Sequence, residues 1–453
     1  MDNNLTKICK RTKDIFKNLN LTAHKTKFMQ RTSKLDGESI INTVILTQYL
    51  CRQASLEDYS TNYRLLTGKN ISRQGFDKRI NKNTNNFLKE ILTQLIKIIP
   101  NKNCVNPKLL SSFSSVKVID STSIELNEAL KDNFKGSGGC ASASAVKIQT
   151  IFSPLSNNLN YFDITAGNVP DNKFICNFTN IEELESNSLL LMDLGYSSVD
   201  FFNSLNDNNI KFITRYKKDL KIFSIQNPEK EIDLIELLKN NKNKNIIDTN
   251  ILLTKKHFPC RIIIYPVKDK TFRERLKKKK RDYQKKGNVL NDNAIELLKW
   301  SIMITNTSID EVNTLNIYKI YRLRWSIELF FKLWKSELDF DYLSTFKEDR
   351  LYFEIYSKLI CVLIFTNFTQ LLLSDVDEEI EISPFKSFSC FKLFIYEFLK
   401  CVYSSKRLEQ FIISNKLLFI RKFLKKSYKK RKTTLSKLNV HNKGGWKISY
   451  EAL

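Results

Sequence analysis

The chain has 453 residues, 42% of them apolar, which is enough to bury a large core and more than one average domain holds. Its 74 Lys and Arg against 48 Asp and Glu give a net charge of +26, and a field of that sign attracts polyanions. Nucleic acid is therefore the expected partner. Nine cysteines without a CxxC pair and only three histidines argue against a disulfide framework, a zinc centre or a histidine-based nucleophile.

Nothing in the sequence predicts secretion or membrane insertion. The first residues lack the apolar core of a signal peptide, and the best apolar run, Leu359 to Phe365, is too short to span a bilayer. A soluble, cytoplasmic protein with reduced thiols is expected.

Residues 1 to 112 are predicted to form a helical, DNA-binding region. Apolar residues recur with helical spacing from Ser39 to Leu50 and again from Phe87 to Ile99. Between these stretches Ser72 is placed to cap a short basic helix. That helix fits a helix-turn-helix, but it fits an ordinary surface helix equally well.

Residues 113 to 345 are predicted to form a mixed α/β domain. Strands are expected at Val116–Asp120, Val146–Phe152, Leu159–Ile164, Leu189–Asp193, Ile210–Arg215 and Trp300–Thr305. A partly β insertion is expected at about 217 to 298, with strands at Ile251–Thr254 and Arg261–Val267 and a very basic stretch from Arg273 to Lys286. The alternation of strands and helices predicts a sheet covered by helices on both faces.

A long helix is predicted from about Thr314 to Leu338. Residues 346 to 453 are expected to be helical again and to end in a basic tail, which contains Lys425, Lys426, Lys429, Lys430, Arg431 and Lys432.

Two aspartates each close an apolar predicted strand, and both are candidate metal ligands. Asp120 follows Val116–Ile119, and Asp193 follows Leu189–Met192. Carboxylates suit Mg²⁺ or Mn²⁺, and two such ions activate a water or a 3′-hydroxyl and stabilise the leaving oxygen of a phosphodiester. The alternative interpretation of each aspartate is a turn or cap residue.

The predicted helix carries a third carboxylate. Tyr321, Arg324, Glu328 and Lys335 lie at offsets of 0, 3, 7 and 14 residues. At about 100° per residue, these four side chains form one stripe about 60° wide. Leu323, Ile327, Phe330, Trp334 and Leu338 form the neighbouring apolar flank. A charged stripe also occurs as an ordinary solvated face, but the coincidence of strand, strand and helix carboxylates in a basic chain favours a metal site.

The chain resembles the insertion-sequence-4 family of transposases, whose catalytic domain is ribonuclease H-like and contains a DDE triad. The helix spacing Tyr-x2-Arg-x3-Glu-x6-Lys is the family's signature and matches Tyr321, Arg324, Glu328 and Lys335. The segments Asp120-Ser-Thr and Leu191-Met-Asp-Leu-Gly-Tyr196 resemble those bearing the first and second aspartates, and segments at 138–149 and 164–167 are also similar. Residues 25 to 345 are covered, and the resemblance implies a β-rich insertion before Glu328.

The resemblance also implies roles for single residues. Asp120, Asp193 and Glu328 would be the catalytic carboxylates and would hold two Mg²⁺ or Mn²⁺ ions. Arg324 and Lys335 would hold DNA near them, and Tyr321 would pack or hydrogen-bond beside the scissile strand. Trp325 is a candidate for stacking on a displaced base. Many relatives carry Arg after the second aspartate, whereas this chain has Leu194, which removes one phosphate contact.

The expected function is therefore a bacterial, nucleoid-associated insertion-sequence transposase that binds its element's terminal inverted repeats, cleaves them and joins the 3′-hydroxyls to target DNA. Synapsis of two ends implies a homodimer on DNA, and no membrane partner is expected. Two alternatives remain open. One is a related metal-dependent nuclease without strand transfer, and the other is a decayed copy that only binds DNA.

Overall fold

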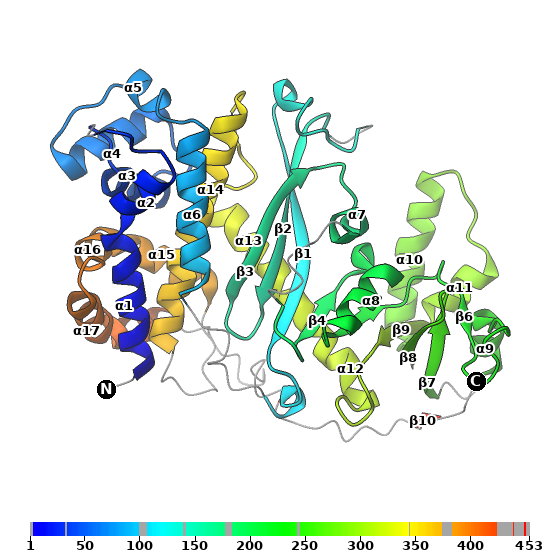
Figure 1. Ribbon diagram of the computed structural model, residues 1–453. Coiled ribbons are helices and arrows are strands. Elements are labelled where there is room, and N and C mark those ends of the chain that lie inside the picture. The colour runs from blue at the N-terminus through cyan, green and yellow to red at the C-terminus, as the bar shows by residue number, and fades with distance from the viewer. Residues whose placement is uncertain are drawn as a thin grey trace. The chain divides into compact units, whose positions relative to one another are not determined.

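The computed structural model describes residues 3–31, 34–98, 107–138, 142–176, 184–241, 245–343, 345–373, 383–423, 438 and 448–449 (Figure 1). Packing divides the chain into two compact units. The first contains residues 1–104, 120–169 and 325–437, and the second contains residues 105–119, 170–324 and 438–453. The N-terminal and C-terminal helices thus belong to the same unit, a grouping that differs from the three consecutive regions predicted by the sequence. The predicted basic tail at 425–432 lies outside the described residues.

The first unit is mainly helical. Its described helices are α1 (Asn3–Lys17), α2 (Leu19–Lys25), α3 (Gly37–Leu50), α4 (Leu56–Thr67), α5 (Arg73–Asp77), α6 (Lys82–Ile96), η3 (Glu128–Leu130), α13 (Trp325–Leu338), α14 (Glu348–Leu373), α15 (Pro384–Leu393), α16 (Ile395–Cys401) and α17 (Ser405–Phe423). Local sequence fixes where several of them begin. Ser72 caps α5 as predicted, since its side chain accepts a hydrogen bond from the backbone N–H of Gly75.

Helix α14 forms the centre of this unit and packs against α3, α6, α15 and α17. Its C-terminal half contributes Phe365 and Phe368 to an aromatic cluster with Phe388 and Phe391. The apolar run Leu359–Phe365 lies within this helix. Residues Glu348–Leu372 form one helix that is long and apolar enough to cross a bilayer, and 94% of its most apolar window is buried inside the protein, as in a core helix.

The sheet of the first unit consists of the second half of β1 (Val116–Glu125), β2 (Ala145–Ser153) and β3 (Asn158–Ala166). β2 and β3 are antiparallel, with an irregularity at Ile151/Phe152, and α6 and α14 pack on β3. The prediction that Asp120 ends its strand was wrong. β1 continues to Glu125 because it remains paired with β2 beyond Asp120, and its burial changes there from a fully buried run to the alternation of a half-exposed strand.

The second unit contains the rest of the sheet, in the order β10-β7-β8-β9-β5-β4-β1, with β6 paired to β7. Its strands are the first half of β1, β4 (Leu189–Met192), β5 (Lys211–Arg215), β6 (Ile222–Phe223), β7 (Ile246–Leu253), β8 (Phe258–Pro266), β9 (Trp300–Thr305) and β10 (Ile448–Ser449). β1, β4 and β5 are parallel, whereas β5, β9, β8 and β7 are successively antiparallel. The predicted mixed sheet with flanking helices is thus confirmed.

The described helices of the second unit are η2 (Lys108–Leu110), α7 (Asp171–Cys176), η5 (Leu194–Tyr196), α8 (Val199–Asp207), α9 (Leu234–Asn240), α10 (Asp269–Lys285), α11 (Asp292–Leu298), α12 (Thr314–Tyr321) and η6 (Arg322–Arg324). The predicted insertion is partly β, as expected. Its strands β7 and β8 extend the main sheet through β9, and its basic stretch forms helix α10 (Figure 1).

A buried ion pair joins the insertion to the segment that precedes α12. The Arg261 guanidinium donates to both carboxylate oxygens of Asp248, at 2.7 and 2.5 Å. It also donates to the backbone oxygens of Ser308 and Val312, and Thr314 Oγ1 donates to Asp248. Because every partner is hydrogen-bonded, this cluster fixes the start of α12 against β7 and β8.

The long helix predicted from Thr314 to Leu338 is interrupted. Helix α12 ends at Tyr321, a 3₁₀ turn covers Arg322–Arg324, and α13 begins at Trp325. A 3₁₀ turn has about 3.0 residues per turn instead of 3.6, so the single 60° stripe does not persist through it. Tyr321 and Arg324 are buried in the second unit, while Glu328 and Lys335 are half-buried in the first. The predicted apolar flank from Leu323 to Leu338 is buried, as expected.

Candidate active site

In the second unit, Asp193 and Arg215 form an ion pair at the carboxyl edge of the parallel strands. Asp193 directly follows β4, whose four apolar residues are all buried, and Arg215 ends β5. The parallel register pairs Met192 with Thr214, which places the next residue of each strand side by side. Arg215 Nη2 lies 2.8 Å from Asp193 Oδ1, and the Asp193 side chain is 35% exposed.

The signature residues of α12 and η6 lie on the same edge. α12 packs against β5 and η6 against β4. Although burial opposes ionisation, the hydrogen bond and charge of Arg215, with a further contribution from Arg324, lower the pKa of Asp193. Burial raises the pKa of Tyr321, whose hydroxyl faces Arg215. The second unit therefore holds an ionised carboxylate paired with Arg215 and stabilised further by the charge of Arg324, with the Tyr321 phenol facing Arg215.

The glycine of the Asp-x-Gly-Tyr segment lies against α7. A Cβ at Gly195 would lie 2.8 Å from Oδ2 and 3.4 Å from Cβ of Asp171 in α7. A larger residue would therefore require the Asp171 carboxylate to move.

In the first unit, Asp120 is fixed through its backbone. Its carbonyl oxygen accepts a hydrogen bond from Thr150 Oγ1 of β2 at 3.0 Å, and its Oδ1 accepts one from the backbone N–H of Ser121 at 2.9 Å. The side chain is half-buried, as expected where a fully buried strand segment becomes partly exposed.

Glu328 lies in the first turn of α13, a helix held by apolar packing. Ile327 and Trp334 are fully buried, and the ring of Phe330 lies 4.5 Å from that of Phe152 in β2. Asp120 and Glu328 are therefore both carried by elements anchored to β2, at Thr150 and Phe152. A negative side chain is also favoured at the N-terminal end of a helix.

The other predicted DNA contacts of α13 differ in their surroundings. Lys335 forms an ion pair with Asp341 at 2.9 Å, and its side chain is 33% exposed. Trp325 is 59% exposed, an unusual state for a tryptophan at the start of a helix. Both residues are accessible to a ligand.

The structure thus brings Asp193, Tyr321 and Arg324 together in the second unit, and places Asp120, Glu328, Lys335 and Trp325 in the first. In the described part of the chain, no group of three or more His, Cys, Asp or Glu side chains is gathered in a way that could hold a metal ion. Sequence reasoning missed Arg215. Its signal was a cation at the end of the strand predicted to follow Asp193, in the position that parallel register brings beside that aspartate.

Comparison with known proteins identifies the family. Residues 111–364, more than half of the chain, match the family described as "Transposase DDE domain". A transposase for insertion sequence element IS1151 of Clostridium perfringens is 28% identical over 461 residues, covering 96% of each protein. A transposase for insertion sequence element IS231E of Bacillus thuringiensis subsp. finitimus is 29% identical over 364 residues, covering 76% of this chain and 75% of the relative.

Among solved structures, the piggyBac transposase in a synaptic complex with hairpin DNA is similar with a TM-score of 0.46 and 12% identity, over 90% of this chain and 82% of that one. The match to the catalytic-domain family and the near full-length similarity to insertion-sequence transposases agree with the family resemblance inferred from the sequence. The chain belongs to the DDE transposases and is a DNA transposase of the insertion-sequence-4 type.

Proposed function

We propose that this transposase cleaves the ends of its own insertion sequence and joins their 3′-hydroxyls to target DNA, with Asp120, Asp193 and Glu328 as the ligands of two Mg²⁺ or Mn²⁺ ions. The observation that carries the proposal is the half-exposed carboxylate of Asp193 at a sheet edge, paired with Arg215 at 2.8 Å, with its pKa lowered further by the charge of Arg324. Such an arrangement presents an anionic metal ligand beside cations that attract phosphate.

The chemistry of the donor set fits a hard divalent cation. All three proposed ligands are carboxylates, and the lowered pKa of Asp193 keeps that group ionised at neutral pH. When bound, the ions would supply charge stabilisation at the attacking and leaving oxygens of the phosphodiester. Arg215 would hold the Asp193 carboxylate in position, as hydrogen-bond partners of metal ligands commonly do.

Cationic and aromatic residues would position the DNA. Arg324 is buried, and its charge contributes to lowering the pKa of Asp193, so its guanidinium would suit a fixed contact to a phosphate beside that carboxylate. Tyr321 would orient that contact, and Lys335 would contact the backbone after exchanging Asp341 for a phosphate. The exposed ring of Trp325 would stack on an unpaired base.

Cleavage of a linear DNA carrying both element ends, in the presence of Mg²⁺, tests this proposal. We expect Asp120→Asn, Asp193→Asn and Glu328→Gln each to lower the cleavage rate by at least about 10³-fold while end binding in a gel shift persists. Asp200→Asn is a matched control, because Asp200 is an exposed aspartate on α8 that pairs with Lys256 at the surface. Normal metal-dependent cleavage by Asp120→Asn would overturn the assignment.

Pre-cleaved ends separate transposition from hydrolysis alone. Supplied with such ends and a supercoiled plasmid, the protein should insert them by direct attack of the 3′-hydroxyl. Cleavage of intact ends without any joining of pre-cleaved ends would identify a metal-dependent nuclease instead. Binding without either reaction would indicate a decayed copy, the alternative raised by Leu194.

The proposed assembly is a homodimer that binds two terminal inverted repeats in the bacterial cytoplasm, in association with the nucleoid. The net charge of +26 favours association with DNA. Light scattering on the complex with one or two end duplexes would measure the number of protomers, and a single protomer on paired ends would contradict a dimeric synapse.

A further inference from the structure

Helix α10 is a highly charged helix of the second unit. Its 17 residues run from Asp269 to Lys285, and none of them is buried. One face rests on the protein through half-buried residues, which include Phe272, Leu276 and Tyr283. Arg275 anchors this face to the end of α11 and to β9, because its guanidinium donates to the carbonyl oxygen of Trp300 at 2.9 Å and to Ser301 Oγ at 2.8 Å.

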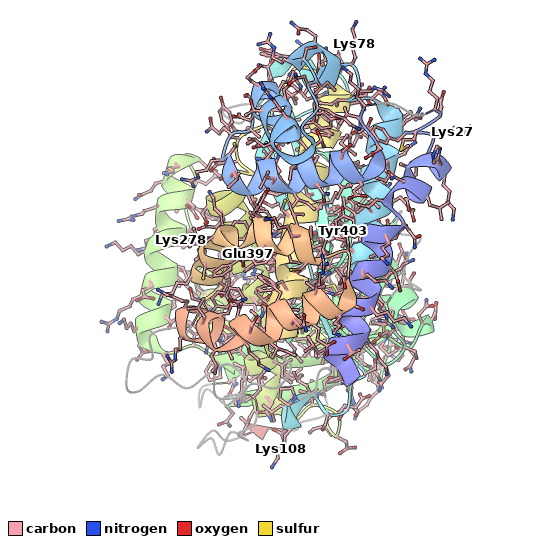
Figure 2. All side chains as sticks on the ribbon, turned by 90° about the vertical axis from the view of Figure 1, so that its left-hand side faces the viewer. Lys27, Lys78, Lys108, Lys278, Glu397 and Tyr403 are labelled. Carbon is pink, nitrogen blue, oxygen red and sulfur yellow. The ribbon has the colours of Figure 1, made fainter. Side chains whose placement is uncertain are left out.

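The opposite face of α10 carries a row of cations. Arg273, Lys277, Arg281 and Lys285 are all exposed and recur every fourth residue, so they form one ridge along the helix. We call these four residues the α10 ridge. Lys270, Lys278 and Lys280 are exposed beside the ridge, and Figure 2 shows Lys278 directed away from the ribbon of α10. Glu274 and Asp282 are the only acidic residues on α10 beyond its first position.

The α10 ridge has no anionic partner within the described parts of the chain. None of its four cations forms an ion pair there, and neither Glu274 nor Asp282 does so. Like charges four residues apart weaken a helix, and the ridge contains three such successive pairs. An arrangement that weakens its own helix and is not neutralised by the protein is suited to an external polyanion.

The inner face of α10 connects this helix to the strands of the candidate active site. Arg275 donates to Trp300 and Ser301 at the start of β9. β9 is antiparallel to β5, with Met303 paired to Arg215, the ion-pair partner of Asp193. These contacts lie within the second unit, so α10 is held on the strand that neighbours β5 while its ridge faces outward.

We propose that the α10 ridge binds the phosphate backbone of the target DNA duplex, a role that rests on the proposed function of the protein. Four cations at intervals of four residues span about 18 Å, the length of roughly five base-pair steps. Long, flexible cationic side chains contact phosphates without reading bases. Element ends have a fixed sequence, whereas target sequences vary, so a ridge of exposed cations suited to phosphate contacts matches the target.

Strand transfer with pre-cleaved ends tests this role. The variant with Arg273, Lys277, Arg281 and Lys285 all changed to Gln should lower insertion into a plasmid by more than tenfold near physiological salt. For binding to a random duplex, the slope of the logarithm of the binding constant against the logarithm of the salt concentration should become shallower by about 3 to 4, at about 0.9 for each lost phosphate contact. Cleavage of intact element ends should remain within twofold of the parent protein.

A matched control removes the same charges from another helix. Lys406, Arg407, Arg421 and Lys422 are exposed on α17, and changing all four to Gln also removes two Lys and two Arg. This control should transfer strands normally. Equal loss of strand transfer in both variants would show that overall charge matters and not the ridge, and normal transfer by the ridge variant would also overturn the proposal.

If the ridge variant also lost cleavage of intact element ends, the ridge would be assigned to those ends instead. If the parent protein did not cleave element ends, the proposed function itself would be refuted.

Discussion

The two units hold their shares of the candidate site by different forces. In the first unit, the helix that carries Glu328 is fixed by aromatic packing, with Trp334 fully buried among Phe330, Phe331 and Phe340. In the second unit, Asp193 is fixed by a guanidinium, and α12 is fixed by the buried pair of Arg261 and Asp248. Apolar packing is insensitive to charge, so substitutions that change charge should affect mainly the second unit.

The largest effect is expected where that buried pair is broken. Asp248→Ala leaves the Arg261 guanidinium buried without its carboxylate, which should lower the free energy of unfolding by about 4 kcal/mol. Chemical denaturation followed by circular dichroism measures this loss. The double variant Asp248→Leu/Arg261→Met should recover most of it, because replacing both partners removes the unpaired charge. A loss below about 1 kcal/mol for Asp248→Ala would show that the pair does not stabilise the unit.

The next prediction concerns activity. Arg215→Gln removes the guanidinium that holds Asp193 and should slow Mg²⁺-dependent cleavage by about 10- to 100-fold. Arg215→Lys should restore part of the rate, because lysine keeps the positive charge but lacks the guanidinium geometry. Lys218→Gln is a matched control, since Lys218 is an exposed cation just after the same strand. An unchanged rate with Arg215→Gln would show that Asp193 needs no such partner.

Much of this arrangement was predictable from local sequence. The strands predicted at 146–152, 159–164, 189–193, 210–215 and 300–305 follow from apolar runs, and the structure confirms them to within two residues. The position of Asp193 after β4 follows in the same way. The cap at Ser72 and the buried flank of α13 also depend on neighbours close in the chain, which is why periodicity detects them.

The missed features depend on contacts between distant segments. The 3₁₀ turn at Arg322–Arg324 separates α12, which packs on β5, from α13, which packs on residues of the first unit. A periodicity calculated at a constant 100° per residue assumes one continuous helix, so it cannot detect that the two halves pack on different elements. The pairing of Arg261 with Asp248 joins antiparallel strands whose register the sequence did not give, and the role of Arg215 required the register of β5 beside β4. The catalytic roles of Asp120, Asp193 and Glu328 therefore remain a prediction, although the strands and the helix that carry these residues are now described.

Two buried titratable groups on α14 are an exception to this contrast, and they predict a pH effect in the first unit. Burial raises the pKa of Glu354 on α14 to about 7, and burial lowers that of Lys358 to about 8. Between pH 5 and 7 the folded protein therefore holds a proton on Glu354 that the unfolded chain, with a pKa of 4.5, has released. Stability should fall by about 2 kcal/mol as pH rises through this window.

Glu354→Gln tests this effect because glutamine cannot ionise. Its unfolding free energy should change less than that of the parent between pH 5 and 7, measured by denaturation at a series of pH values. Glu348→Gln, at the start of the same helix, is the control, and it should keep the parent's slope. Identical slopes for Glu354→Gln and the parent would assign the pH dependence to other groups.

The smallest predicted effect tests whether the first unit also depends on single polar contacts. Asp36 caps α3, since its Oδ1 accepts a hydrogen bond from the Ser39 N–H at 2.7 Å and its own N–H donates to Ser39 Oγ at 3.0 Å. Asp36→Ala should cost about 1 kcal/mol of unfolding free energy, and Asp36→Asn should cost less because asparagine also caps. Since α3 is otherwise held by buried apolar residues that include Ile40 and Ile41, a loss as large as that expected for Asp248→Ala would mean that polar contacts stabilise both units equally.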